Sequence, residues 1–461
     1  MTDLDTSDRD DTGATGVAAA PASPDKDRLG ANYYKLFTGT VVSNLGDGIG
    51  TVAYPWLASA ITRNPILVAL VAVAQRLPWL VFTLPAGVIT DRVDRRKAMM
   101  WMDVLRGVLT VGVAFAVLGS QGGLPGPDEV DTVVGTRWGL LTMVLVATLL
   151  LGMAEVLRDN ANQTIIPNIV RSDQLEKANG RIWGVEAVTN TFAGPPLGSV
   201  LLIVAFSLPF FVDAATFFVA AAMVALIPGT FRAQRDPNRP RQTFRQELGE
   251  GVHWLMAHPL LRPMAIILGL MNGAGMIAFA TFVLFAQEVM EVGPFLFTVI
   301  GFGGAIGGLL GGNVAPWVTR RVGSGTALAI SIGGLAVVPF LVGAIAWWPA
   351  VLVLFGFEAF FGILWNVITV SLRQAIIPEG LLGRVNSVYR FFAWGMIPIG
   401  SAIGGVWVWV MERQVDREFA LRSTWFLVGA IHVALFLFGR AKLTTDKIEA
   451  ARAAATTPSA S

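Results

Sequence analysis

Long runs of apolar residues alternate with short polar segments along most of the chain. A run of about 20 apolar residues is long enough to cross a bilayer, and it must be helical because lipid offers no partners to backbone groups. The pattern predicts an all-α polytopic membrane protein with twelve transmembrane helices. These helices are expected near residues 35–60, 65–90, 98–119, 138–165, 180–204, 207–228, 263–288, 294–317, 324–346, 349–376, 385–411 and 422–440.

Composition and charge agree with this interpretation. The 461 residues are 54% hydrophobic and 14% charged, with a mean hydropathy of +0.61, whereas soluble proteins carry about 25% charged residues. Lys and Arg gather after the second expected helix and in residues 229–262, while the opposite connections hold few or balanced charges. Because basic loops face the cytoplasm, we expect a multi-pass protein of the cytoplasmic (inner) membrane with both termini cytoplasmic.

The two halves of the chain are related in sequence. QTIIP at Gln163–Pro167 recurs as QAIIP at Gln374–Pro378, and GPPLGS from Gly194 corresponds to GSAIGG from Gly400. A duplicated unit of six helices predicts two pseudo-symmetric six-helix bundles. The expected divisions are a disordered cytoplasmic tail (1–33), an N-terminal bundle (34–228), a cytoplasmic linker with an amphipathic helix (229–262), a C-terminal bundle (263–441) and a second disordered cytoplasmic tail (442–461).

Several classes of function have little support in this sequence. There are no cysteines and only three histidines, and the net charge is +2. Disulfides and thiol chemistry are excluded, and no nucleic-acid partner is expected. No nucleotide-binding glycine loop or His-x-x-x-His pair is present, so we expect neither an enzyme nor a cofactor. A metal site at His253 and His258 is the weaker alternative, because histidines near lipid headgroups explain both residues.

The most densely charged turn is GVITDRVDRRKAM, Gly87–Met99, between the second and third expected helices. Its spacing, Gly-x-x-x-Asp-Arg-x-x-Arg-Arg, resembles the loop 2–3 signature of the major facilitator superfamily, with Asp94 at a position where that family usually has glycine. The resemblance implies the major facilitator fold, in which two six-helix bundles rock about a central cavity.

The resemblance also implies a gate at this turn. Asp91 would cap the start of helix 11 near Asn386 while the protein faces outward, because free amides at a helix start carry partial positive charge. The arginines of the turn would brace the loop against acidic partners such as Asp159. The expected gating residues are Gly87, Asp91, Arg92, Arg95, Arg96, Asp159 and Asn386.

The fifth expected helix contains GPPLGS, which leaves its middle without large side chains and without two backbone donors. Such a helix bends and admits a close neighbour. We expect that neighbour to be helix 8, where two stripes at four-residue spacing are formed by Gly303, Gly307 and Gly311 and by Gly304, Gly308 and Gly312. The sequence also resembles the antiporter motif of exporters in the superfamily, which implies export. The motif residues are Gly194, Pro195, Pro196, Gly198 and Ser199.

Charged residues inside the expected membrane helices are candidates for proton coupling. Asp47 lies about halfway along the first helix, where a charge costs at least about 2.5 kcal/mol and must be paired or protonated. Asp103 and Arg106 are one turn apart and can pair. A purely structural charge network remains the alternative. The candidates are Asp47, Asp103, Arg106, Glu155 and Arg158.

Polar and aromatic residues of the later helices are candidates for a substrate cavity. Aromatic side chains suit an amphipathic substrate, although such residues also face lipid or fill cores. The expected cavity residues are Asn162, Glu358, Trp365, Asn366, Phe391 and Trp394.

Taken together, the chain resembles proton-coupled exporters of the drug-efflux and enterobactin-exporter type. That resemblance implies export of an amphipathic small molecule, drug or siderophore-like, in exchange for protons. We expect a monomer whose partners are its substrate, protons and the lipid bilayer. Proton-coupled uptake by the same fold, a membrane enzyme acting on lipids and a transport-inactive sensor remain alternatives.

Overall fold

The computed structural model describes residues 29–90, 92–120, 124–126, 129, 132–232 and 244–456, and these residues are almost entirely helical. The expected N-terminal tail lies largely outside this range. In the first half, the helices are α1 (Ala31–Ile61), α2 (Pro65–Val81), α3 (Thr83–Thr90), α4 (Arg95–Ser120), α5 (Trp138–Ile169), η3 (Ser172–Gln174), α6 (Leu175–Val188), the π-helix η4 (Thr189–Ala193), α7 (Gly194–Val204) and α8 (Leu208–Ala225).

The second half begins with the amphipathic linker helix and repeats the six-helix arrangement. Its helices are α9 (Phe244–Ala257), α10 (Leu261–Phe279), α11 (Phe282–Glu288), α12 (Pro294–Val322), α13 (Ser324–Ile345), α14 (Trp348–Ile376), α15 (Glu379–Met411), α16 (Arg417–Lys442) and α17 (Thr445–Thr456).

Ten helical segments of the described residues are long and apolar enough to cross a membrane. The two remaining predicted crossings are α1 and the α2–α3 pair. α1 has 31 residues, including Asn44 and Asp47 in its middle, which lower its hydropathy. α2 has 17 residues and is separated from α3 by a break at Phe82. The all-α two-bundle fold is confirmed, and the count of twelve crossings stays a prediction.

The two bundles repeat the same close packing. A methyl group on Gly194 would lie 2.5 Å from Cα of Gly48, so α7 packs directly on α1. In the second bundle, a methyl group on Gly400 would lie 1.9 Å from the carbonyl oxygen of Gly273, so α15 packs directly on α10. Related motifs in the two halves therefore fill equivalent positions, as the duplicated sequence predicts.

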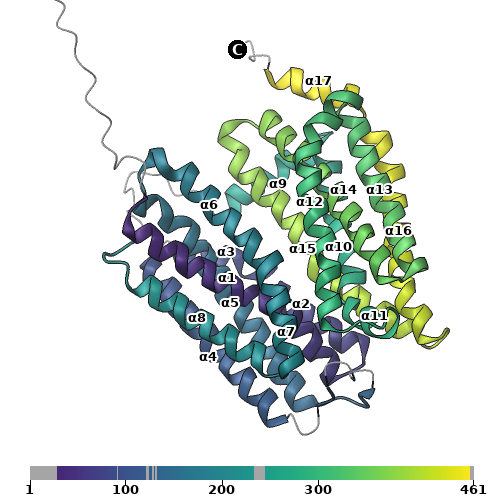
Figure 1. Ribbon diagram of the computed structural model, residues 1–461. Coiled ribbons are helices and arrows are strands. Elements are labelled where there is room, and N and C mark those ends of the chain that lie inside the picture. Colours follow the sequence, from purple (N-terminus) through teal and green to yellow (C-terminus); the bar gives the residue numbers. More distant parts are fainter. Residues whose placement is uncertain are drawn as a thin grey trace, which may run out of the picture.

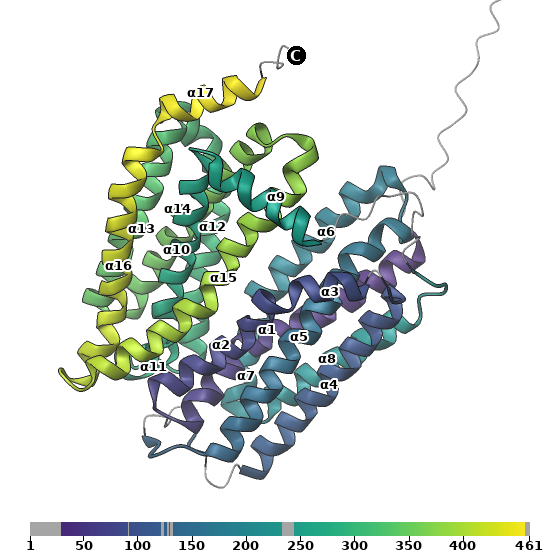
Figure 2. The ribbon, with the colours of Figure 1, turned by 180° about the vertical axis from the view of Figure 1, so that it is seen from behind.

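The bundles lie close together at one end of the molecule, near α2, α7 and α11, and diverge toward the end that carries α9 and α17 (Figures 1 and 2). We call these the α11 end and the α9 end. The seam between the bundles is formed by α2 against α15 and by α7 against α12. At the first contact, a methyl group on Gly405 would lie 2.6 Å from Cβ of Ala69.

The segments outside the bundles differ in how they match the expectation. The expected linker helix is present as α9, which packs on α15, where a methyl group on Gly251 would lie 2.9 Å from the carbonyl oxygen of Arg384. The predicted disordered tail from residue 442 is wrong over Thr445–Thr456, which forms α17. Ile448 supplies the reason: its side chain is fully buried in the core of the C-terminal bundle, in a segment otherwise rich in helix-forming alanine.

Candidate functional site

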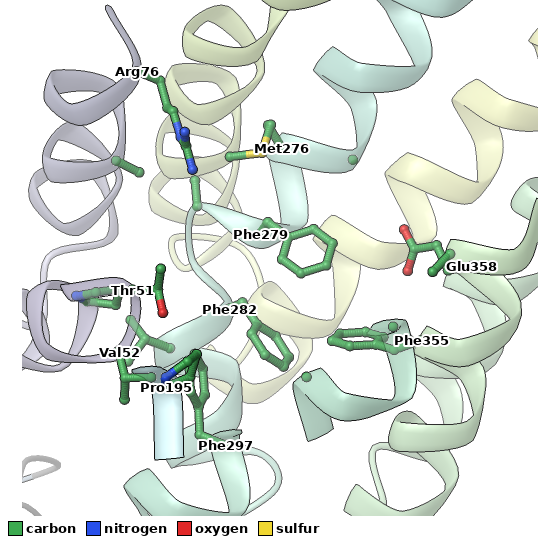
Figure 3. A pocket seen from close by; sticks show the side chains of 18 of the residues that line it. Thr51, Val52, Arg76, Pro195, Met276, Phe279, Phe282, Phe297, Phe355 and Glu358 are labelled. Carbon is green, nitrogen blue, oxygen red and sulfur yellow. The ribbon is translucent and has the colours of Figure 1, made fainter. Parts of the chain in front are cut away.

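A cavity of about 730 Å³ lies between the two bundles. Residues of α1, α2 and α7 form one wall, and residues of α10, α11, α12 and α14 form the other. Aromatic rings dominate the second wall: the ring centroids of Phe279 and Phe355 are 5.4 Å apart, and those of Phe282 and Phe355 are 5.2 Å apart (Figure 3). The size and apolar lining match those of small-molecule binding sites.

Two opposite charges enter this cavity from different bundles. Arg76 of α2 points into it from one side and Glu358 of α14 from the other (Figure 3). The Oε2 atom of Glu358 is buried and has no hydrogen-bond partner among the described residues. The third titratable residue of the lining, His432, is satisfied by its own helix, because Nδ1 lies 2.8 Å from the carbonyl oxygen of Val428.

Most of the expected cavity residues lie elsewhere. Glu358 lines the main cavity, and Asn366 lines an adjoining cavity of about 510 Å³ between η4, α12 and α14. The prediction that Trp365 lines the cavity is wrong, because its side chain is fully buried in the C-terminal core. Phe391 is exposed on α15, and the ring of Trp394 stacks on Trp79 with centroids 6.0 Å apart.

The buried charges of the N-terminal bundle form one connected network. Asp47 is paired with Arg106, as its position in the membrane requires. Arg106 also lies 3.8 Å from Asp103, which accepts a hydrogen bond of 2.9 Å from Arg158. Arg158 lies 3.7 Å from Asp159. These contacts join α1, α4 and α5, and the expected Asp103–Arg106 pair is present.

Neutral groups extend this network. Asn190 of η4 donates a hydrogen bond of 2.7 Å to Asn44 of α1, and the guanidinium of Arg106 lies 3.9 Å from the ring centroid of Phe217. Glu155 interacts electrostatically with Asp47 and Arg106 without a direct hydrogen bond. Asn162 is buried on α5, with no partner for its Oδ1 atom among the described residues.

A second buried acid, which is not among the expected coupling residues, lies beside this network. Asp213 of α8 is buried, and its Oδ1 atom has no partner in the described part of the chain. It faces α1 directly beside Asp47, since a methyl group on Gly46 would lie 2.3 Å from that oxygen. The signal available in the sequence was a lone aspartate in an otherwise apolar helix.

The charged turn after α3 is held differently from the expectation. Asp91 lies outside the described residues, so its docking stays a prediction. Arg95 donates hydrogen bonds of 2.9 Å to the carbonyl oxygen of Thr164 and to Oδ1 of Asn168. Arg96 donates one of 2.6 Å to the carbonyl oxygen of Ile227. The arginines therefore brace the turn through backbone and amide oxygens of α5 and the end of α8, not through Asp159.

Four further details concern the expected gate. Arg92 is exposed, and a methyl group on Gly87 would meet no atom within 4 Å. Asp94, at the family's glycine position, accepts hydrogen bonds of 3.0 Å from the backbone N–H groups of Lys97 and Phe231. α15 begins at Glu379, so the amide of Asn386 lies inside the helix and is not one of its free first-turn donors.

The GPPLGS motif forms the start of α7, directly after the π-helix η4. Its close neighbour is α1: a methyl group on Gly198 would lie 2.7 Å from the carbonyl oxygen of Ile49. The expected neighbour, helix 8 (α12), does contact α7 across the seam. Its Gly303–Gly307–Gly311 stripe does not make this contact, since a methyl group on Gly307 would lie 1.8 Å from the carbonyl oxygen of Gly356 in α14. Ser199 donates a hydrogen bond of 2.8 Å to the carbonyl oxygen of Pro196 within the helix.

An ion cluster that the sequence did not predict closes the α11 end. Glu288 at the end of α11 is paired with both Arg63, after α1, and Arg417, at the start of α16. Arg63 also donates a hydrogen bond of 2.6 Å to Gln287, and Arg417 donates one of 2.8 Å to the carbonyl oxygen of Arg63. The cluster therefore links the N-terminal bundle to the C-terminal bundle. In the sequence, the indication of this cluster was a single arginine, Arg63, in the very short connection between α1 and α2.

Two related helical bundles around a shared cavity are the architecture of secondary membrane transporters, and the family and relatives of this chain are transporters, not enzymes. A family model described as Major Facilitator Superfamily matches residues 36–404, and the chain belongs to this superfamily of transporters.

Relatives of the chain include two kinds of exporter. It is similar to the multidrug efflux pump Tap of Mycolicibacterium fortuitum, with 25% identity over 382 residues that cover 79% of this chain and 86% of the relative. It is also similar to the enterobactin exporter EntS of Shigella boydii serotype 4 (strain Sb227), with 24% identity over 416 residues that cover 88% of this chain and 91% of the relative.

Solved structures share the fold. A single-residue mutant of the nucleoside transporter NupG superposes with a TM-score of 0.66 at 11% identity, and the match covers 89% of this chain and 100% of that protein. A bacterial homologue of the iron transporter ferroportin in an inward-facing state gives a TM-score of 0.63 at 15% identity, covering 89% of this chain and 98% of that one.

Proposed function

We propose that this transporter exports an amphipathic small molecule across the cytoplasmic membrane in exchange for protons. The observation that carries the proposal is an aromatic cavity between the bundles, beside a buried network whose acids are held by arginines. The names of the relatives, a multidrug efflux pump and an enterobactin exporter, favour export. In this proposal the chain acts as a monomer and both termini face the cytoplasm.

The arrangement supports alternating access in the following way. The α11 end, which we assign to the outside, is closed by the Glu288 cluster, while the bundles diverge at the α9 end. Opening outward requires the bundles to separate at Glu288 and to approach each other at the α9 end. The turn containing Arg95 and Arg96 would then be brought toward the C-terminal bundle.

Asp47 is the proposed proton carrier. In the present arrangement it is paired with Arg106, and it lies on α1, the helix that also lines the cavity through Thr51 and Val52. Protonation neutralises the carboxylate and releases Arg106 to the neighbouring Asp103. The position of α1 is thereby tied to proton binding, which is the coupling that antiport requires.

The test is transport in proteoliposomes of known orientation with an imposed pH gradient. Uptake of a fluorescent amphiphile into vesicles that are acidic inside, together with proton efflux reported by a pH dye, is the expected result for the protein inserted inside-out. Asp47→Asn is expected to abolish the proton flux and the gradient-driven accumulation. A matched control, Asp416→Asn at the exposed start of α16, is expected to change neither. Accumulation that is unaffected by an uncoupler would refute proton antiport.

A further inference from the structure

The charges of the cavity restrict the kind of molecule that it binds. Arg76 and Glu358 are the basic and the acidic residue among those that line it, and they belong to opposite bundles (Figure 3). Neither forms an ion pair or a hydrogen bond with a described residue, although Arg76 interacts electrostatically with Glu155 of α5. The rings of Phe279, Phe282 and Phe355 line the same cavity.

An unpaired carboxylate inside a membrane protein is costly unless it takes up a proton or something supplies its partner. Glu358 has no partner among the described residues of its own bundle, since its Oε2 atom is buried without a hydrogen bond. Asn272, on the same side of the cavity, is engaged with the carbonyl oxygen of Ala393 at 2.8 Å. The remaining source of a positive charge on that side is the molecule inside the cavity.

Arg76 is the corresponding basic residue on the opposite side of the cavity. Its side chain is exposed to the cavity, and a guanidinium offers paired donors that suit a carboxylate, phenolate or phosphate. A molecule that carries only a cation would satisfy Glu358 and be repelled by Arg76. A molecule that carries only an anion would meet the opposite difficulty.

We propose that the cavity selects zwitterionic amphiphiles, whose cationic group pairs with Glu358, whose anionic group pairs with Arg76 and whose apolar body lies against the phenylalanines. This inference rests on the proposed function, because the occupant of the cavity is taken to be the exported molecule. Since the two charges belong to different bundles, such a molecule also bridges the bundles.

The test measures binding to the purified full-length chain in lipid nanodiscs without any gradient. The probes share one biphenyl body: 4′-(aminomethyl)biphenyl-4-carboxylic acid, its methyl ester, its N-acetyl derivative and the doubly blocked compound. The corresponding one-ring series covers a shorter charge separation. The zwitterion of one series is expected to bind at least about tenfold more tightly than either singly charged derivative, which corresponds to about 1.4 kcal/mol per lost ion pair.

Single variants of the two cavity residues test which charged group of the probe each residue binds. Glu358→Gln is expected to remove the preference for the zwitterion over its N-acetyl derivative, and Arg76→Gln the preference over its methyl ester. The double exchange of Arg76→Glu with Glu358→Arg is expected to restore the preference, because the zwitterion can bind in the reverse direction. Glu418→Gln and Arg321→Gln are matched controls at exposed charges outside the cavity and are expected to have no effect.

Several results would overturn the inference. Equal binding of the zwitterion and a singly charged derivative, or absence of binding in both series, would do so. Unchanged selectivity in Glu358→Gln would identify Glu358 as a permanently protonated acid with no role in recognition. The outcome is separable from that of the proposed function: selective binding without proton-driven transport refutes antiport alone, and proton-driven transport of singly charged amphiphiles refutes the selectivity alone.

Discussion

Replacing Glu288 by alanine removes the carboxylate at the centre of the ion cluster that closes the α11 end. Its carboxylate is paired with Arg63 of the N-terminal half and with Arg417 of α16. When the bundles separate at this end, the pair with Arg63 is broken, whereas the pair with Arg417, which lies in the same bundle as Glu288, is kept. Glu288→Ala therefore weakens an interaction made in only one of the two conformations, and it should shift the equilibrium toward the outward-open form.

The size of the shift follows from the burial of the three side chains. Glu288 is 15% exposed, Arg63 12% and Arg417 35%. A fully exposed pair would contribute about 0–1 kcal/mol, and loss of one partner from a buried pair costs about 3–5 kcal/mol. We take about 2 kcal/mol for this intermediate case, which is a factor of about 30 in the ratio of the two conformations.

Distances between spin labels measure this ratio directly. The chain contains no cysteine, so labels attach only where a cysteine is introduced. A pair at Val134 and Gln414 reports the α11 end, and a pair at Ser172 and Ala454 reports the α9 end; all four positions are exposed. In nanodiscs, Glu288→Ala is expected to lengthen the first distance and shorten the second in a new population of molecules.

The matched control is Glu418→Ala, which removes an exposed acid paired with Arg422 inside a single helix, α16. It should leave both distance distributions unchanged. Identical distributions for Glu288→Ala and the parent chain would refute the assignment of the cluster as a closing contact. So would a shift of equal size in the control, because it would show that charge loss alone moves the bundles.

Three further predictions concern stability. Gly400→Ala places a methyl group 1.9 Å from the carbonyl oxygen of Gly273 and should cost about 1–3 kcal/mol, seen as a lower Tm, whereas Gly180→Ala, with open space around it, should not. Ile448→Asp should lower Tm by detaching α17, because the isoleucine is fully buried, and unchanged protease resistance of the C-terminus would contradict this. Burial lowers the pKa of His258 below its usual 6.5, and the neutral ring accepts backbone hydrogen bonds at the start of α10. This stabilisation is present above about pH 6.5 and is lost as the pH falls through the lowered pKa, so His258→Ala should flatten the dependence of Tm on pH between about 5 and 8.

The sequence predicted those features that depend on periodicity, repetition and local spacing. Apolar runs located the helices, and the GPPLGS and GSAIGG motifs revealed a repeat whose copies pack equivalently on α1 and α10. Spacing along one helix also predicted the Asp103–Arg106 pair. The need of a charge in the bilayer for a partner predicted that Asp47 would be paired or protonated, but its partner Arg106 lies 59 residues away and could not be identified without the fold.

The substrate cavity was harder to predict for a physical reason. In a membrane protein the core, the lipid-facing surface and the lining of an amphipathic cavity are all apolar, so composition does not separate them. Trp365 is in the core, whereas Phe279, Phe282 and Phe355, which have the same chemistry, line the cavity. Likewise, the ion cluster joins Arg63 to Glu288 across 225 residues, and no local pattern connects them.

The π-helix Thr189–Ala193 is a point at which the two halves of the fifth membrane segment, α6 and α7, can rotate relative to each other. A wide turn of this kind holds one residue more than an α-helical turn, and moving that residue along the chain rotates one half of the helix by about 100° against the other. α7 is locked to α1 at Gly194, where no side chain fits, whereas Gly180 and Gly184 of α6 face open space. One half of the segment can therefore change the face that it offers to the neighbouring bundle while the other half stays packed on α1, so substrate release need not break the close contact between α7 and α1.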